Sequence, residues 1–329
     1  MFTRTLLQWT RSSVAKALAL AFVFSLVFTG KTYAATDWSA IQSAMKVNGS
    51  LLPGNVLRFE LDRKDLTVSV NGQVLNPFES QAANGFVAFK EIHDGWFFAD
   101  GSLPAQESEL PAVQAALRAN SHIRITAIAS RVIDESPKLI WVHFEADGNG
   151  ADLAATIATA LAVMQNPQSG ISIIPGVNTV IDPASILPPN FLKLFDEGYV
   201  EVLENVFAFY LPRPDENRIF LGGLLGGVKA ETGLGVGQSF YITISVTGGT
   251  TASMDIDFAL RAEEVQAVED TLRAGGFTVT SQSNWYDDEE PRLYFVHVTG
   301  SGDGFTLATT LYSVIQIIQA DSRRFGDSF

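Results

Sequence analysis

The 329-residue sequence contains no cysteine, which excludes disulfide bonds, thiolate metal sites and attachment of a lipid to a cysteine. Histidine is scarce as well, and the four residues of this type limit the imidazole bases that an active site could use. Basic residues are also few, because 22 Lys and Arg stand against 36 Asp and Glu, for a formal net charge of −14. Such a surface repels phosphate backbones, so we expect no nucleic-acid partner.

A short apolar run near the N-terminus predicts a secretory signal peptide over residues 1–34. Three basic residues and no acid precede the segment ALALAFVFSLVF at 17–28, and a small-residue exit ends at Ala34. The run is too short to span a bilayer, which takes about 20 apolar residues. We therefore expect cleavage after Ala34, a periplasmic or extracellular protein, and no stable membrane insertion; the alternative is an uncleaved anchor. Without the four leader bases the charge is (22 − 4) − 36 = −18.

The chain repeats itself. DESPKLIWVHF at 134–144 returns as DEEPRLYFVHV at 288–298, and LRFELDRKD at 57–65 is matched by FAFYLPRPD at 207–215. The segments that begin at Asp100 and Asp257 also match, if the first has two extra residues. Because the order of the pairs is preserved, we predict a tandem duplication. Its parts follow the signal peptide in this order: first repeat 35–165, linker 166–188, second repeat 189–329.

Each repeat alternates strand-like pairs with helical patterns. Helices are expected at 107–119 and 152–164 in the first repeat and at 262–274 and 306–318 in the second, with short lead-in helices at 37–45 and near 191–195. Strand-like segments flank the acidic turns and predict hairpins. The expected fold is therefore α+β, built from two units of paired antiparallel strands and two helices in a pseudo-twofold arrangement.

His143 and His297 occupy equivalent positions on the repeated strand. Strand alternation groups each imidazole with large apolar side chains, which favours a core or interface residue over a ligand. The neighbouring strand should supply partners for a metal or an acid–base site, but it offers only poor metal ligands: Ala127, Ala129 and Arg131 in the first repeat, and Ser281, Ser283 and Trp285 in the second. We therefore predict no metal and no cofactor.

These features together resemble the LppY/LpqO family of exported bacterial proteins of unknown function, which carry a duplicated domain. The resemblance covers residues 37–318 and includes the DRKDL segment, the turn at Asp100 and the motif SP-x-L-x-W-V-H. It implies a strand reading Thr-Ala-Leu-His-Asn-His before the acidic turn. In this chain those positions run from Thr126 to Arg131 and from Thr280 to Trp285, and both family histidines are missing from both copies. A triad built on them would therefore be lost here.

Two further acidic motifs have structural explanations. DGNGAD at 147–152 superficially resembles a calcium loop, but it lacks the terminal Glu of such a loop and suits a strand-to-helix turn. DDEE at 287–290 is expected to be a solvated hairpin turn.

Three functional interpretations remain open. The favoured one is a non-catalytic, exported binding or interaction protein whose ligand is an unknown small molecule or envelope component. Exposed tryptophans such as Trp96 would contribute to such a site, as would these residues: Trp141, Trp285, Arg131 and Asn284. The second is a hydrolase-like enzyme, in which His143 or His297 would act with a carboxylate of Asp100 or Asp257. The third is a structural scaffold in which the two repeats bury apolar faces against each other.

Overall fold

The structure is a computed structural model, and it describes residues 36–70, 73–74, 83–165, 187–189, 199–203, 206–222, 227–231, 234 and 238–324. The predicted signal peptide and the second lead-in helix lie outside the described residues, as does nearly all of the predicted linker. The chain divides into two compact units, Met1–Asp37 and Trp38–Phe329, and the elements named below belong to the second unit. Of the helices that the structure describes, none is both long enough and apolar enough to cross a membrane.

The first half is a six-stranded antiparallel sheet covered on one face by three helices. The strand order is β1-β2-β5-β6-β9-β7. The strands are β1 (Ser50–Leu52), β2 (Val56–Asp62), β5 (Asn84–His93), β6 (Trp96–Gln106), β7 (Ile123–Ala129) and β9 (Leu139–Asn149). The helices are α2 (Ser39–Met45), α3 (Leu110–Arg118) and α4 (Gly150–Val163), and the short strands β3 (Ser69–Val70), β4 (Gln73–Val74) and β8 (Glu135–Ser136) form a separate small sheet.

The second half repeats this sheet with the order β10-β11-β14-β15-β17-β16. The strands are β10 (Tyr199–Leu203), β11 (Val206–Pro212), β14 (Gln238–Gly248), β15 (Thr251–Arg261), β16 (Thr278–Ser283) and β17 (Leu293–Asp303). The helices are α6 (Ala262–Ala274) and α7 (Gly304–Arg324), and an insertion holds the 3-10 turn η3 (Glu216–Arg218) with the small pair β12 (Phe220–Leu221) and β13 (Val228–Lys229). The predicted α+β duplication is thereby confirmed.

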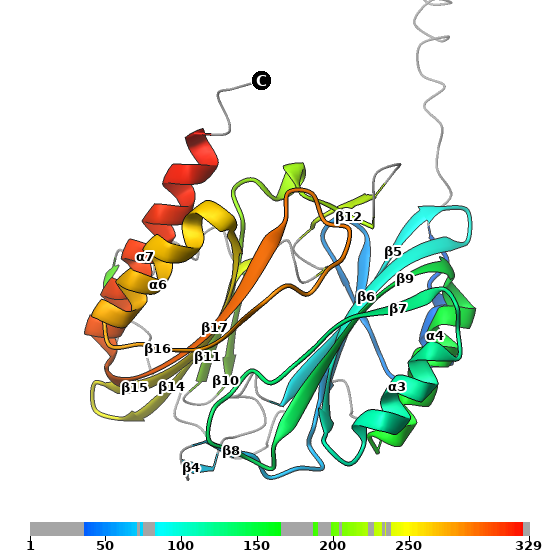
Figure 1. Cartoon of the computed structure of the whole chain (residues 1–329), viewed down its shortest axis with the longest axis horizontal. Coiled ribbons are helices and arrows are strands. Elements are labelled where there is room, and N and C mark those ends of the chain that lie inside the picture. Colours follow the sequence, from blue (N-terminus) through cyan, green and yellow to red (C-terminus); the bar gives the residue numbers. More distant parts are fainter. Residues whose placement is uncertain are drawn as a thin grey trace, which may run out of the picture. The chain divides into compact units, whose positions relative to one another are not determined.

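Each sheet has its helices on one face and turns the other face toward the opposite half (Figure 1). Alternation along β5 produces this division, because Val87 and Phe89 pack under the helices while Phe86 and Ala88 point to the other half. The second half contributes Leu293 and Phe295 to the same interface. The two halves therefore share an apolar cluster in addition to the helix-covered core that each half has of its own.

The strand registers fix which residues are equivalent in the two halves. Ser102 lies opposite His143 in the β6–β9 pair, and Asp257 lies opposite His297 in the β15–β17 pair. Asp100 is therefore equivalent to Asp255 and not to Asp257. The expected two-residue insertion between the copies is wrong, because the spacing between equivalent positions stays constant from β6 into α3.

Two buried arginines hold the equivalent helices in place. Arg63 Nη1 donates to the carbonyl of Pro104 at 2.9 Å and to Glu109 Oε2 at 2.8 Å, and its Nε donates to Asp65 at 2.9 Å. Glu109 also accepts a hydrogen bond from the backbone N–H of Gln106, just before α3 begins. We call this set the first arginine clamp.

The second arginine clamp has the same geometry. Arg213 Nη1 donates to Glu264 Oε2 at 2.9 Å and to the carbonyl of Ala259 at 2.6 Å, while Nε donates to Asp215 at 2.9 Å. Burial alone would raise the pKa of Asp215, but Arg213 and Arg261 hold it below its usual value. The repeated letters DRKD and PRPD therefore encode a structural ion pair, which explains why they recur.

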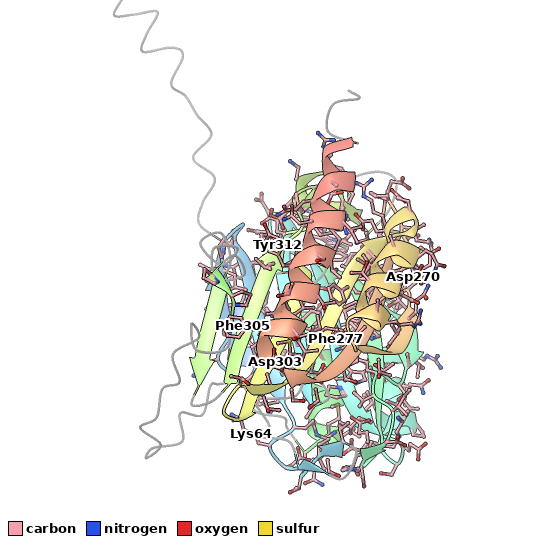
Figure 2. All side chains as sticks on the ribbon, turned by 90° about the vertical axis from the view of Figure 1, so that its left-hand side faces the viewer. Lys64, Asp270, Phe277, Asp303, Phe305 and Tyr312 are labelled. Carbon is pink, nitrogen blue, oxygen red and sulfur yellow. The ribbon has the colours of Figure 1, made fainter. Side chains whose placement is uncertain are left out.

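The DGNGAD motif starts a helix. Asn149 Oδ1 accepts hydrogen bonds from the backbone N–H groups of Ala151 and Asp152, at 3.0 and 3.2 Å, and so caps α4. Asp303 caps α7 in the equivalent way, through Thr306 at 2.9 Å. Figure 2 shows Asp303 at the start of α7, with Phe305 and Tyr312 farther along the same helix. A strand-to-helix turn therefore accounts for both copies.

Candidate functional site

A layer of polar side chains lies between the two sheets, and it contains most of the residues that the sequence marked as candidates. We call it the polar layer. Its members come from both halves: Asp100, Ser102, Arg131 and His143 from the first, and Asp255, Asp257, Tyr286 and His297 from the second. Most of these side chains are buried. Burying so many polar groups is costly unless they pair with one another, so their pairing determines the chemistry of the site.

His297 is held between two carboxylates of β15. Its Nδ1 lies 2.8 Å from Asp257 Oδ1, and its Nε2 lies 3.1 Å from Asp255 Oδ1. Burial alone would lower the pKa of His297, but the two aspartates outweigh it and raise the pKa to about 10. The imidazole is therefore a cation at neutral pH.

Arg131 reaches the same carboxylate from the other half. Its Nη1 lies 3.0 Å from Asp257 Oδ2, and its Nη2 donates to Ser102 Oγ at 3.2 Å. Burial alone would raise the pKa of Asp257, but Arg131 and His297 together hold it below its usual value. The guanidinium carbon also lies 3.6 Å above the ring of Trp141 and 4.3 Å from the ring of Trp285, a cation–π sandwich.

His143 has an apolar environment instead. Trp285 stacks on it, with 4.3 Å between ring centroids and 17° between ring planes, and Trp285 also stacks on Phe295, with 3.8 Å between ring centroids. Burial lowers the pKa of His143 well below its usual value, and the charge of Arg131 lowers it further. Its Nε2 has no hydrogen-bond partner among the described residues. His143 is therefore neutral at physiological pH.

The structure brings Asp257 to His297 as the sequence predicted, but it does not bring Asp100 to His143 as a hydrogen-bond partner in the same way. Asp100 Oδ2 instead accepts a hydrogen bond from Tyr286 Oη at 2.7 Å across the interface. Burial raises the pKa of Asp100 well above its usual value, and the hydrogen bond from Tyr286 only partly opposes this. Asp100 therefore joins the two halves.

The expectation that the tryptophans line an exposed site is wrong for two of them. Trp141 is 1% exposed, with the Arg131 guanidinium of its own half above its ring, and Trp285 is 7% exposed, because it stacks on His143 of the first half. Trp96 is half-buried and stacks beside His93 at 6.1 Å. Asn284 uses its amide to hold its own hairpin, donating to the carbonyl of Leu293.

Three members of the polar layer were not predicted from the sequence, namely Ser102, Asp255 and Tyr286. Asp255 was missed although its alternation with Asp257 on one strand face was visible in the letters MDID. Glu289 was expected to be solvated, but it is buried. Its carboxylate folds back into its own hairpin and accepts a hydrogen bond from the backbone N–H of Leu293 at 3.2 Å. Glu135 has the equivalent role in the first half, accepting from Leu139 at 3.0 Å.

A cavity of about 100 Å³ is lined by residues of both halves. Residues of the first half, including Phe98, Arg124 and Glu145, line it together with Leu221 and Val228 of the second half. Arg124 pairs with Glu145 at 3.1 Å within its own half, and with Asp288 at 2.8 Å in the other half.

Comparison with known proteins identifies one family. A family model described as "Domain of Unknown Function (DUF1259)" matches residues 39–163 and 199–317, which correspond to the two halves. No curated protein matches the sequence.

Two solved structures share a distant likeness. EtuB from Clostridium kluyveri is 9% identical with a TM-score of 0.21, over 84% of this chain and 92% of that chain. The trimeric bacterial microcompartment shell protein PduB is 12% identical with a TM-score of 0.22, over 83% of this chain and 91% of that chain. TM-scores this low carry no argument about fold or function.

Proposed function

The chain belongs to the family of unknown function whose model matches both of its halves, and from this premise we propose that it is an exported, non-catalytic binding protein of the LppY/LpqO type. The observation that carries the proposal is the state of the two repeated histidines. His143 is 2% exposed and His297 is 1% exposed, so a substrate in solution could not reach either imidazole.

The protonation states argue in the same direction. A general base must be unprotonated near the working pH, whereas a pKa of about 10 keeps His297 charged. His143 is neutral, but the ring face that could meet a ligand is occupied by Trp285. Neither imidazole is therefore available to a substrate as a general base at neutral pH.

The residues at the positions where the LppY/LpqO resemblance implies histidine support the loss of a former histidine site. Arg131 and Trp285 stand at the last of those positions in the two copies, and each reaches across to the opposite half. A guanidinium and an indole cannot replace imidazole as metal ligands. We infer that these substitutions closed the ancestral site and left an interface.

A hydrolase-like function is the second candidate, and one contact favours it. Asp257 lies 2.8 Å from His297 Nδ1, the distance expected when a carboxylate orients a catalytic imidazole. Arg131 competes for the same carboxylate at 3.0 Å, however, and the far side of the imidazole faces Asp255 and not a nucleophile.

A broad screen of the purified chain on chromogenic esters, phosphates and amides distinguishes the two candidates. We expect no turnover with wild type. Turnover that is abolished in both His297→Gln and Asp257→Asn, while Glu135→Gln keeps it, would overturn the proposal and favour the hydrolase.

Export is tested separately. A chain with a C-terminal tag should be found in the envelope or the culture fluid, with an N-terminus at Ala35. Retention in the cytosol with the leader intact would overturn this part of the proposal.

A further inference from the structure

Glu145 lines the cavity, and one of its two carboxylate oxygens has no hydrogen-bond partner among the described residues. The residue is 1% exposed, and its Oε2 accepts a hydrogen bond from Arg124 Nη2 at 3.1 Å. Its Oε1 is buried and has no hydrogen-bond partner among the described residues. Leaving a buried acceptor unpaired costs about 1–3 kcal/mol. A ligand that supplies a donor at this point would remove that cost.

The charges around Glu145 favour a cationic donor. Arg124 is the cation that lines the cavity among the described residues, and both of its Nη atoms are already engaged, with Glu145 and with Asp288. Asp147 adds a carboxylate to the lining. The other ionisable groups that act on Glu145 are acidic: Asp287, Asp288 and Glu289 of the second hairpin, together with Asp100 and Tyr286 of the polar layer.

The remaining walls are apolar. Phe98 and Leu221 are both buried in the cluster shared by the two halves, and Val228 belongs to the same cluster. Such walls suit an alkyl chain, and an aromatic ring also favours a nearby cation. A metal ion, in contrast, needs several oxygen ligands around it.

We propose that this cavity binds a small primary alkylammonium ion, whose ammonium group donates a hydrogen bond to Glu145 Oε1 and whose alkyl chain packs against Phe98, Leu221 and Val228. The inference rests on the proposed binding function and specifies its ligand class. The cavity of about 100 Å³ has the volume of about three water molecules, which is enough for a chain of a few carbon atoms.

Binding of an ammonium ion at Glu145 should be coupled to the release of a proton, so its affinity should depend on pH. Burial raises the pKa of Glu145 to about 7; Arg124 opposes the rise, and Asp287, Asp288 and Glu289 add to it. An ammonium ion binds the ionised carboxylate, so binding releases a proton below this pKa. Because the ionised fraction rises from about one tenth at pH 6 to about nine tenths at pH 8, affinity should increase about tenfold over that range.

Titration calorimetry with n-butylammonium chloride tests the proposal directly. At pH 8 the folded full chain should bind n-butylammonium saturably, whereas n-butanol and butyrate should not bind. Glu145→Gln keeps the size of the side chain but removes the charge, and should weaken binding at least about tenfold. Glu135→Gln is the matched control, because Glu135 is also buried with a pKa of about 7 but does not line the cavity. It should bind within about twofold of wild type.

The pH dependence of n-butylammonium affinity is measured on wild type alone. It therefore tests the proposal even if Glu145→Gln fails to fold. Absence of butylammonium binding at pH 8, equal binding of n-butanol, or an affinity independent of pH would each overturn the ammonium site. Native mass spectrometry of the chain purified from the envelope distinguishes a failure of the ammonium site from a failure of the proposed binding function. A different retained ligand would leave the binding function standing, whereas turnover in the substrate screen would overturn the function itself.

Discussion

Trp285 of the second half lies flat on His143 of the first half, and its indole fills the space in front of the imidazole. The same hairpin ties itself to the first half a second time, because Thr126 donates a hydrogen bond to the carbonyl of Trp285. A residue of the second half, Trp285, therefore covers the repeated histidine of the first half, His143. The stability of the whole unit should depend on that contact.

Removing the indole should destabilise the protein strongly. Trp285→Ala leaves a cavity between His143 and Phe295, and deletions of this size in packed interiors cost about 3–5 kcal/mol. Urea unfolding measures the loss. Trp96→Ala is the control, because Trp96 is half-buried at the end of its sheet, and it should cost about 1 kcal/mol or less. Equal losses in the two variants would mean that the interface does not hold the halves together.

Stability should decline as the pH rises above neutrality. The folded-state pKa of His297, about 10, lies above the ordinary value of 6.5, so the folded chain holds this proton more tightly than the unfolded chain. The contribution is therefore complete below pH 6.5 and is lost as the pH approaches 10. Urea unfolding at pH 7, 8 and 9.5 should show a steady fall in the free energy of unfolding for wild type.

His297→Gln removes the titrating group, so its free energy of unfolding should change less between pH 7 and 9.5 than that of wild type. The variant should also be less stable than wild type at pH 7, because Asp255 and Asp257 lose their shared cation. An unchanged slope would show that His297 is not the group responsible.

Glu135 should contribute a second pH dependence at lower pH. Burial raises its pKa from 4.5 to about 7, so stability present below pH 4.5 is lost as the pH rises through 7. Glu135→Gln keeps an acceptor for the backbone N–H of Leu139 and should flatten the curve between pH 5 and 7. Asp134→Asn, one residue away in an exposed turn, should leave the curve as it is in wild type.

Each arginine clamp should behave as one coupled unit. Arg213→Met leaves Glu264 buried without its partner, and breaking a buried ion pair costs about 3–5 kcal/mol. The double variant with Glu264→Gln should recover part of this loss, giving a coupling energy of about 2–3 kcal/mol in a double-mutant cycle. Arg273→Met, which removes the pair between a half-exposed guanidinium and Glu269, should cost less than Arg213→Met, about 1 kcal/mol or less. Additive effects of Arg213 and Glu264 would contradict the clamp.

The repeated fold could be predicted from the sequence because duplication shows every pattern twice. The helix at 262–274 was placed correctly, since one apolar face and a first-turn acid mark it. The segment LTVSV at 66–70 has the composition of a strand, but only Ser69–Val70 forms one, and it pairs only with other two-residue strands. A short apolar run does not by itself show what it pairs with.

The site was only partly predictable. Asp257 was named as a candidate partner of His143 or His297, whereas Asp255 was missed because the two copies were aligned two residues out of register. The burial of Trp285 depends on a contact between the two halves, and periodicity within one repeat carries no information about such a contact. The cavity beside Glu145 also needs residues from both halves.

The exchange of Arg131 for Trp285 at equivalent positions makes the two halves complementary and no longer interchangeable. Two copies of the first half docked in this way would set each guanidinium opposite Ser102, in place of the Asp257 carboxylate that pairs with it here. Two copies of the second half would bring Asp255 and Asp257 of each together without an arginine between them. The two halves therefore fit each other as the different subunits of a heterodimer do, and neither repeat can take the place of the other.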